Sequence, residues 1–340
     1  MNFPKFTAAS VIASPAMFDL SGTVNKCCSY IEEASENGAK LVVFPETFIP
    51  MYPWWIWMSV NNVKKLELYK DLYKNSVDIH GSEFKKIRDK ASECNVYVVV
   101  GINEINSMTL YNSQVFINDQ GEIIGKRRKL VPTGEERTIW GRGDGSDLFV
   151  CDTDIGKLSG LVCYENSMPL SRYALYSMGA QIHIANWPGS NFKSQPRDRT
   201  KIIDLTSRFA AFEGQMFVIA SSSYLGEEEL AFYKELDPSL GDSLTVGGGI
   251  AGIISPFGEY VSRPLQDEEG IAYGEIDLEA VLDSKHLLDS VGHYARGDVA
   301  KLLLNKEDAN PVKIKNNDTS DLTEAREGIE VLSSTQDVNK

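Results

Sequence analysis

The feature that most constrains the fold of this chain is a regular alternation of short apolar runs with segments of helical periodicity. An apolar run over residues 7–14 is followed by a segment in which Val24, Cys27 and Ile31 recur at helical spacing. The alternation continues through most of the chain and is typical of an α/β domain. The expected strands are residues 7–14, 41–44, 96–101, 110–117, 123–129, 158–163, 181–186 and 216–221, and the expected helices lie around residues 22–38, 84–94, 170–177 and 202–212.

The domain organisation follows from the absence of a composition break. No Pro-, Gly- or Ser-rich linker interrupts the alternation, so we expect one catalytic domain over residues 1–304. Residues 305–340 are polar and nearly free of aromatic residues, and we expect a tail that is flexible or ordered by an oligomer. Residues 61–79 read as an insertion, for which a pocket lid and an oligomer contact are equally defensible.

Charge, hydropathy and cysteine usage exclude several classes of protein. The 34 Lys and Arg against 48 Asp and Glu give a net charge of −14, which repels nucleic acid. No apolar stretch reaches the roughly 18–20 residues that cross a bilayer, so we expect no membrane partner. The 5 Cys form an odd set without CxxC spacing and the 4 His are scattered, so neither a disulfide framework nor a zinc site is indicated and a cytoplasmic location fits.

Cys163 is the candidate nucleophile. It lies where an apolar strand meets an expected helix, and a thiol at a helix N-terminus is favoured as thiolate. The alternative is a buried structural thiol, the usual state of a free cysteine. We apply that alternative to the other four, which are Cys27, Cys28, Cys94 and Cys151.

A thiol at neutral pH needs a base or a cation beside it. His183 alternates with isoleucines inside a strand and is poorly placed for this. Glu46 and Lys129 each follow or end a strand, at the sheet edge where α/β folds build their sites, and Glu136 lies seven residues after Lys129. A carboxylate that takes the thiol proton and an ammonium that opposes the developing anion suffice for acyl transfer, since one such pair contributes about 4 kcal/mol at about 4 Å.

Three blocks of sequence carry a resemblance to a known family. FPETFIP, KRRKLVPTGEERTIWGRGDGS and CYENSMPL resemble the signature blocks of the carbon–nitrogen hydrolase (nitrilase) superfamily, specifically its nitrilase branch, and the similarity runs from about residue 5 to residue 298. The resemblance implies that Glu46 is the general base, Lys129 the electrostatic stabiliser, Cys163 the nucleophile and Glu136 a supporting glutamate. It also implies an α/β fold of four layers, an α-β-β-α sandwich, in a homodimer or a larger spiral homo-oligomer.

The same resemblance suggests the substrate and the residues around it. It implies hydrolysis of a small nitrile to a carboxylic acid and ammonia through a cysteine thioimidate and thioester, with no metal or cofactor. The residues that it places near the substrate are Tyr52, Trp140, Trp187 and Pro188, together with Tyr164, where many nitrilases carry Trp. Cyanide hydrolysis and aliphatic amide hydrolysis on the same residues remain alternatives.

Two further alternatives belong to other classes. A non-catalytic scaffold would keep the fold for oligomerisation, but all four polar site residues are present, and drift is expected to erase at least one. A histidine-assisted cysteine hydrolase would depend on His183 and not on Glu46. These alternatives predict, respectively, no covalent adduct on Cys163 and loss of turnover on replacement of His183.

Overall fold

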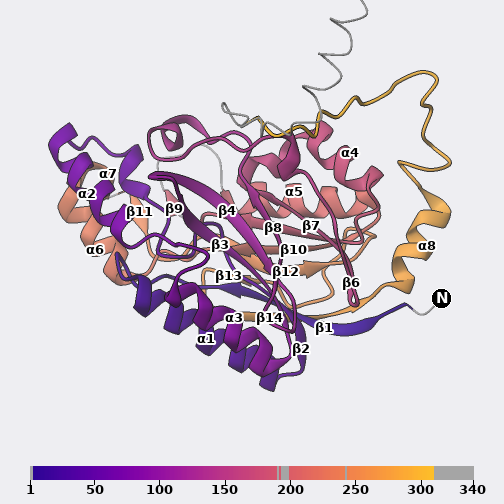
Figure 1. Ribbon diagram of the computed structural model, residues 1–340, viewed down its shortest axis with the longest axis horizontal. Coiled ribbons are helices and arrows are strands. Elements are labelled where there is room, and N and C mark those ends of the chain that lie inside the picture. Colours follow the sequence, from indigo (N-terminus) through magenta and orange to yellow (C-terminus); the bar gives the residue numbers. More distant parts are fainter. Residues whose placement is uncertain (1–2, 190, 193–198, 242, 310–340) are drawn as a thin grey trace, which may run out of the picture. The chain divides into compact units, whose positions relative to one another are not determined.

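Two six-stranded sheets form the centre of the protein in this computed structural model, which describes residues 3–189, 191–192, 199–241 and 243–309 (Figure 1). The strands are β1 (Lys5–Ile12), β2 (Ala39–Val43), β3 (Tyr97–Asn106), β4 (Thr109–Ile117), β5 (Ile123–Arg128), β6 (Cys151–Thr153), β7 (Gly156–Val162), β8 (Ile182–Trp187), β9 (Asn191–Phe192), β10 (Phe217–Ser222), β11 (Leu244–Thr245), β12 (Ile250–Ile254), β13 (Leu265–Gln266) and β14 (Gly270–Asp277). The first sheet has the order β14-β1-β2-β3-β4-β5 and the second β13-β12-β10-β8-β7-β6, while β9 and β11 pair separately.

Both sheets are built on the same plan. The neighbours β1, β2 and β3 run parallel in the first sheet, as do β10, β8 and β7 in the second. Antiparallel strands flank each parallel set, for example β14 beside β1 and β12 beside β10. The carboxyl ends of β2 and β7, after which Glu46 and Cys163 follow, therefore belong to different sheets.

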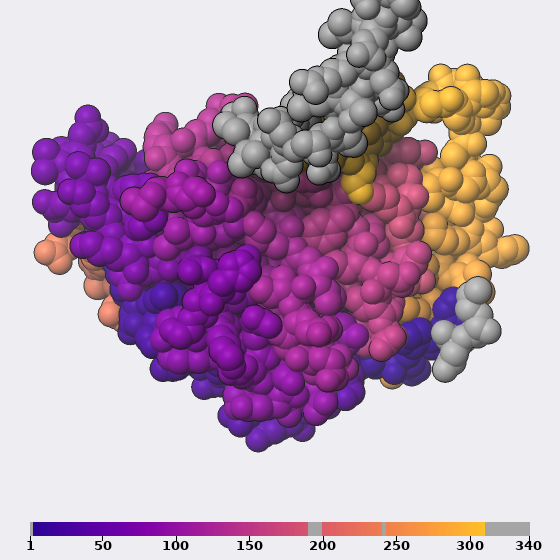
Figure 2. Space-filling view, in the orientation of Figure 1, coloured from indigo at the N-terminus to yellow at the C-terminus, as the bar shows by residue number. Residues whose placement is uncertain are grey.

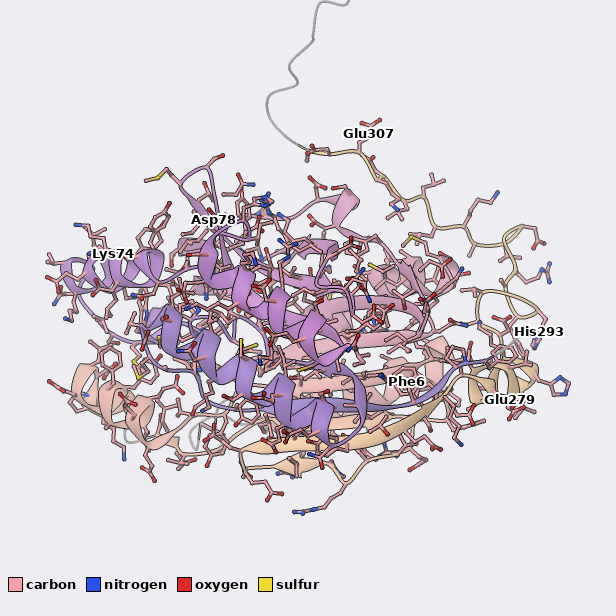
Figure 3. All side chains as sticks on the ribbon, turned by 60° about the horizontal axis from the view of Figure 1, so that its bottom comes forward. Phe6, Lys74, Asp78, Glu279, His293 and Glu307 are labelled. Atoms are coloured by element: carbon pink, nitrogen blue, oxygen red, sulfur yellow. The ribbon has the colours of Figure 1, made fainter. Side chains whose placement is uncertain are left out.

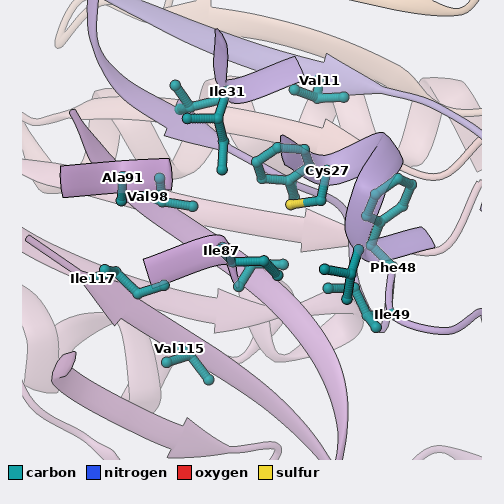
Figure 4. Packing of buried hydrophobic residues seen from close by; sticks show 14 of the residues in the cluster. Val11, Cys27, Ile31, Phe48, Ile49, Ile87, Ala91, Val98, Val115 and Ile117 are labelled. Carbon is teal, nitrogen blue, oxygen red and sulfur yellow. The ribbon is translucent and has the colours of Figure 1, made fainter. Parts of the chain in front are cut away.

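Helices cover the outer faces of both sheets. The helices in the described part of the chain are α1 (Leu20–Glu36), α2 (Asn62–Lys74), α3 (Ser82–Cys94), α4 (Pro169–Ser177), α5 (Arg199–Gly214), α6 (Glu227–Leu236), α7 (Pro238–Gly241) and α8 (Glu279–Leu287), with 3₁₀ turns η1 (Trp54–Trp57), η2 (Gly134–Thr138), η3 (Gly145–Asp147) and η4 (Cys163–Ser167). The helices α1 and α3 pack on the first sheet, where the sulfur of Cys27 points into the apolar cluster (Figure 4), and α4 and α5 pack on the second. A third cluster lies between the sheets, so the four-layer α-β-β-α sandwich is confirmed.

Polar side chains tie the two sheets together inside this apolar core. The Ser10 hydroxyl donates to the Ala220 carbonyl at 2.5 Å, and the Ser221 hydroxyl donates to the Val11 carbonyl at 2.7 Å. The Asn186 amide of β8 donates to the carbonyl of Phe44, two residues before Glu46. Because buried donors need specific acceptors, these bonds fix how the sheets are aligned as well as how they pack.

Several elements differ from the expectations. The helices α6, α7 and α8 and the strands β6, β9, β11, β12, β13 and β14 are not among the expected elements. The helix α2 occupies most of the segment that reads as an insertion, and only Leu68 and Leu72 are buried along it, so its apolar periodicity is weak. The strand β3 continues five residues past its expected end at Gly101, because Asn103 and Glu104 are buried by hydrogen bonding and not by apolar packing. In the remaining expected elements the bounds differ by only a few residues.

The N-terminal strand lies against the last part of the sandwich. The Leu278 amide donates to the Pro4 carbonyl at 3.1 Å, and Figure 2 shows indigo residues of the chain's start beside orange residues near α8. Along the same domain, Lys74 at the end of α2 and the exposed His293 lie at opposite ends in Figure 3. The chain divides into residues 1–307 and 308–340. Of the tail expected over 305–340, residues 310–340 lie outside the described residues, so that expectation stays a prediction.

No helix in the described part of the chain is both long enough and apolar enough to cross a membrane. Within the same ranges, no group of three or more His, Cys, Asp and Glu side chains is arranged to hold a metal ion.

Candidate active site

Glu46 lies in a tight bend after β2. Thr47, the next residue, has a φ of 43°, which turns the chain away from the strand direction. The neighbouring strand contributes Gly101, where a Cβ atom would meet the Pro45 carbonyl oxygen at 2.1 Å and the Thr47 nitrogen at 2.6 Å. Only glycine allows this close backbone approach. The bend buries Glu46 completely, with a relative exposure of 0%.

Lys129 joins both predicted glutamates. Its ammonium contacts Glu46 Oε1 at 2.9 Å and Glu136 Oε2 at 2.7 Å. Glu136 lies in η2, where its carboxylate also accepts the Thr133 amide at 2.7 Å, a capping box that the spacing of Thr133 and Glu136 already signals. The Tyr52 hydroxyl donates to the other oxygen, Glu136 Oε1, at 2.7 Å. The structure therefore brings three of the four predicted catalytic residues into direct contact.

Asn112 is a residue of this cluster that the sequence analysis missed. Its side-chain amide donates to Glu46 Oε1 at 2.6 Å, and its backbone carbonyl accepts the Lys129 amide at 2.8 Å. The carbonyl positions the lysine while the amide positions the glutamate. An Asn inside an expected strand was the available signal, since a buried polar residue needs a partner.

The pKa of Glu46 is shifted upward in this cluster. Burial is the largest cause and raises the pKa from 4.5 to about 7, with Lys129 opposing the rise and Glu136 adding to it. Burial disfavours the Lys129 ammonium as well, but the surrounding acidic groups outweigh this effect and raise its pKa. The second carboxylate oxygen, Glu46 Oε2, is buried with no hydrogen-bond partner among the described residues. Glu46 thus has an oxygen left to receive a proton near neutral pH.

Cys163 stands at the end of β7 in a left-handed backbone conformation. Its φ is 55°, and it begins the turn η4, while α4 starts only at Pro169. The thiol therefore lies at the start of the short 3₁₀ helix η4, and the expected α-helix begins six residues further on. Burial raises the pKa of the thiol, Lys129 lowers it, and Glu46 and Glu136 raise it further. The pKa of the thiol therefore depends on the charges of all three cluster residues.

A cavity beside Cys163 contains most of the predicted substrate residues. Its lining is Cys163, Tyr164, Trp187, Pro188, Arg199, Ile202 and Ile203. The rings of Tyr164 and Trp187 pack edge to face at 6.0 Å. Sequence reasoning missed Arg199, Ile202 and Ile203, because nothing local marks the first two turns of α5 as a pocket wall. Arg199 adds a cation to an otherwise apolar and aromatic lining.

Tyr52 and Trp140 are placed differently from the other predicted substrate residues. Their rings pack 5.7 Å apart, and Trp140 Nε1 donates to Asn103 Oδ1 at 2.8 Å. Tyr52 reaches Glu136 with its hydroxyl, so its direct contact is with the cluster. Contact of either residue with a substrate stays a prediction.

His183 does not assist the thiol. One ring nitrogen bonds the Ser159 hydroxyl at 2.9 Å and the other bonds Asn166 Oδ1 at 2.8 Å. Burial, with Arg127 and Arg172 adding to it, lowers the pKa of His183 to about 3, so the ring is neutral. Both nitrogens are engaged in structural bonds, which leaves a histidine-assisted hydrolase without its base.

The four-layer fold and the buried Glu-Lys-Glu cluster agree with one known protein family. The family model described as carbon-nitrogen hydrolase matches residues 7–285, and the chain belongs to this family. The solved structure of a carbon-nitrogen hydrolase from Helicobacter pylori G27 superimposes with a TM-score of 0.70 at 20% identity, covering 86% of this chain and 96% of that one. That likeness concerns the fold.

Relatives with curated names lie within the same family. A nitrilase of Bacillus sp. (strain OxB-1) is 39% identical over 314 residues, which cover 92% of this chain and 91% of the relative. An aliphatic nitrilase of Rhodococcus rhodochrous is 39% identical over 311 residues, 90% of this chain and 84% of the relative. A cyanide hydratase of Stereum hirsutum is 37% identical over 319 residues, 89% and 84% of the two chains.

Proposed function

We propose that this protein is a nitrilase, which hydrolyses an organic nitrile to the carboxylic acid and ammonia. The observation that carries the proposal is the buried cluster of Glu46, Lys129 and Glu136, whose charges all act on the pKa of the Cys163 thiol. Nitrilase relatives of 39% identity over nine tenths of the chain support the same substrate class. Apart from Arg199, the side chains that line the small cavity beside the thiol are apolar or aromatic, which favours an uncharged organic group.

The proposed reaction begins with proton transfer from the Cys163 thiol to Glu46. The thiolate attacks the nitrile carbon and forms a thioimidate, whose nitrogen takes up the proton while Lys129 and the Tyr164 amide stabilise the developing charge. Water adds to the thioimidate, and ammonia leaves a thioester on Cys163. A second water, activated by Glu46, releases the acid and restores the thiol. Two water molecules are consumed for each nitrile, and no redox change occurs.

The division of labour follows from the charges. Lys129 is held as an ammonium by two carboxylates, so it acts through its charge and does not donate its proton. Glu46 has a pKa of about 7 and an unpartnered oxygen, so it gains and loses a proton in the working pH range. Glu136, held by Tyr52 and Thr133, fixes the lysine.

Ammonia release from a panel of substrates tests this function. The panel comprises aliphatic nitriles, arylacetonitriles, cyanide and the matching amides, and we expect turnover of a nitrile. Cys163→Ala should lose activity by about 10⁶-fold and Glu46→Gln by about 10²–10⁴-fold. Cys94→Ala, which removes a thiol from the end of α3, is the matched control and should retain activity.

Three results would contradict the proposal. Strong turnover of amides without nitriles would assign an amidase. Mass spectrometry that finds no covalent adduct on Cys163, or an adduct elsewhere, would favour a scaffold. Unchanged ammonia release by Cys163→Ala would remove the proposed nucleophile.

In the active enzyme, kcat/KM should fall below a pH of about 7, as Glu46 takes up its proton.

Cyanide hydrolysis is the second candidate, since a cyanide hydratase is 37% identical over most of this chain. The same panel separates the two when formamide is measured beside ammonia, because hydration of cyanide by one water gives formamide and no ammonia. Cyanide also lacks the organic group for which the lining of Tyr164, Trp187 and Ile203 offers contact. Turnover of cyanide alone would favour this candidate.

The assembly and the location are also proposals. We place the reaction in the cytoplasm, because all five cysteines are free and a nucleophilic thiol must stay reduced. A homodimer or spiral homo-oligomer is supported by exposed apolar side chains on the outer helices, namely Leu170, Leu205, Phe209 and Phe212. A monomer in light scattering at micromolar concentration would contradict it.

A further inference from the structure

A second buried ion pair lies directly behind the site, formed by Arg127 and Glu165. Arg127 Nη1 contacts Glu165 Oε2 at 2.9 Å and Nη2 contacts Oε1 at 3.2 Å. The two residues have relative exposures of 1% and 6%. Neither residue takes part in the reaction proposed above. A buried ion pair is weak support for stability, because desolvation of the charges offsets their attraction, so its place in the fold asks for another explanation.

The Glu165 carboxylate also holds two backbone amides. Oε2 accepts the amide of Val162 at 2.9 Å, and Oε1 accepts the amide of Leu130 at 2.5 Å. Val162 directly precedes Cys163, and Leu130 directly follows Lys129. The Glu165 carboxylate therefore hydrogen-bonds the backbone next to the proposed nucleophile and next to its proposed cation.

These two backbone points belong to different sheets. Lys129 follows β5 at the edge of the first sheet, whereas Cys163 follows β7 in the second. The spacing between ammonium and sulfur therefore depends on how the sheets are held at this place. Arg127 is part of β5 and Glu165 is part of η4, so the pair and its two amide bonds span the junction.

The conformation of Cys163 needs such support. A non-glycine residue at a φ of 55° is strained by about 1–3 kcal/mol and persists only when its surroundings enforce it. Glu165 holds the residue before Cys163, and Asn166 Nδ2 donates to the Cys163 carbonyl at 3.0 Å. Because Arg127 neutralises Glu165 through two parallel bonds, the support adds no net charge beside the thiol.

We propose that Glu165 and Arg127 are a positioning pair that sets the distance between the Cys163 thiol and the Lys129 ammonium. The pair acts through the Val162 and Leu130 backbone and does not touch the substrate. The proposal rests on the proposed function only in taking Cys163 and Lys129 as partners in one reaction.

Glu165→Gln is the direct test. The glutamine keeps the shape of the side chain but presents an NH₂ group to a site lined only by donors. One of the two hydrogen bonds from the backbone amides is therefore lost. A displacement of about 1 Å costs about 10²-fold in rate, so we expect kcat to fall by about 100-fold while KM changes little. Alkylation of Cys163 by iodoacetamide, followed by peptide mass spectrometry, should shift to higher pH because the ammonium has moved away.

Glu104→Gln is the matched control. Glu104 is also a buried carboxylate, with 1% exposure, and it pairs with Arg128 and Lys126 of the same strand. Its loss should lower the free energy of unfolding but leave kcat and the alkylation profile of Cys163 as in the unmodified protein. Arg127→Lys is the second variant. The ammonium of the introduced lysine cannot form two parallel hydrogen bonds to Glu165, so kcat should fall by about 10-fold.

Two outcomes overturn the proposal. One is an unchanged kcat and alkylation profile in folded Glu165→Gln or, should that variant not fold, in Arg127→Lys. The other is a Glu104→Gln variant that shows the same loss of kcat and the same alkylation shift. If the unmodified protein releases ammonia from no nitrile, cyanide or amide, the proposed function fails, while the alkylation profiles still decide whether the pair positions Cys163.

Discussion

Two clusters of buried charge share the end of one strand and differ in their chemistry. Residues 126–129 are four consecutive basic residues at the end of β5, and their side chains alternate between the two faces. On one face Lys126 and Arg128 both pair with Glu104. On the other face Arg127 pairs with Glu165, and Lys129 contacts Glu46 and Glu136.

The ratio of charges separates the Glu104 cluster (Glu104, Lys126, Arg128 and Ser113) from the Glu46 cluster (Glu46, Lys129, Glu136 and Tyr52). Burial acts to raise the pKa of Glu104, but hydrogen bonds from Arg128, Lys126 and Ser113 outweigh it and lower the pKa. Burial raises the pKa of Glu46 to about 7, because its one cation is shared with a second carboxylate and does not outweigh the burial. A carboxylate paired with two cations stays ionised at neutral pH. When two buried carboxylates share one cation, one of them can bind and release a proton near neutral pH.

The largest predicted difference comes from removal of one cation. Lys129→Met leaves two buried carboxylates without their shared cation, so we expect a loss of about 3–5 kcal/mol in the free energy of unfolding and no measurable ammonia release. Arg128→Met leaves Glu104 with Lys126 and Ser113, and should cost about 2 kcal/mol with activity retained. Urea unfolding and an ammonia assay measure both. Equal losses in the two variants would erase the distinction.

The pH dependence of stability should have opposite signs in the two clusters. Glu46 binds its proton more tightly in the folded state, so its contribution is greatest below pH 4.5 and is lost as the pH rises toward 7. Glu104 has a lowered pKa, so its contribution is present above pH 4.5 and is lost as the pH falls below that value.

Matched glutamine variants measure this difference in sign. The free energy of unfolding of the unmodified protein relative to Glu46→Gln should fall by about 2–3 kcal/mol between pH 5 and pH 8, since each unit of the pKa shift corresponds to about 1.4 kcal/mol and the fall ends near pH 7. Relative to Glu104→Gln it should stay level over that range and fall only in acid. A level difference for Glu46→Gln would mean that the Glu46 pKa is not raised.

The smallest effects are expected from two matched hydroxyl groups. Tyr52 donates to Glu136 at 2.7 Å, and Ser113 donates to Glu104 at 2.6 Å. A hydrogen bond to a charged group contributes about 1.5–3 kcal/mol, so Tyr52→Phe and Ser113→Ala should each destabilise by about 2 kcal/mol. Only Tyr52→Phe should also lower kcat, because Glu136 holds Lys129. A kcat that falls in Ser113→Ala and not in Tyr52→Phe would reverse the assignment of the two clusters.

Local patterns account for how much of the fold could be predicted. Strands such as β2 and β8 are mostly apolar runs, and α1 and α3 carry an apolar stripe. A local pattern of a few residues therefore predicts each of them. The helix α2 and the end of β3 escaped because charged residues dominate the first and buried polar residues the second.

The candidate site divides in the same way. Glu46, Lys129, Glu136 and Cys163 stand in recognisable blocks of sequence, whereas Asn112, Arg199 and Glu165 gain their places from contacts across the fold. The expectation that the Cys163 thiol is favoured as thiolate differs from the structure, because the turn η4 separates Cys163 from α4 and burial raises the pKa of the thiol.

The sequence by itself determined the alternating elements, the chemistry-bearing residues and the family to which they point. The tertiary structure alone decided which acid meets which base along residues 126–129. Periodicity is a local property, readable over about 10 residues. Ion pairing acts over a few ångströms between residues as distant as Glu46 and Lys129, which are 83 positions apart. The protonation state of the site is therefore set only when β2 and β5 have taken their places in the first sheet and the cluster is buried.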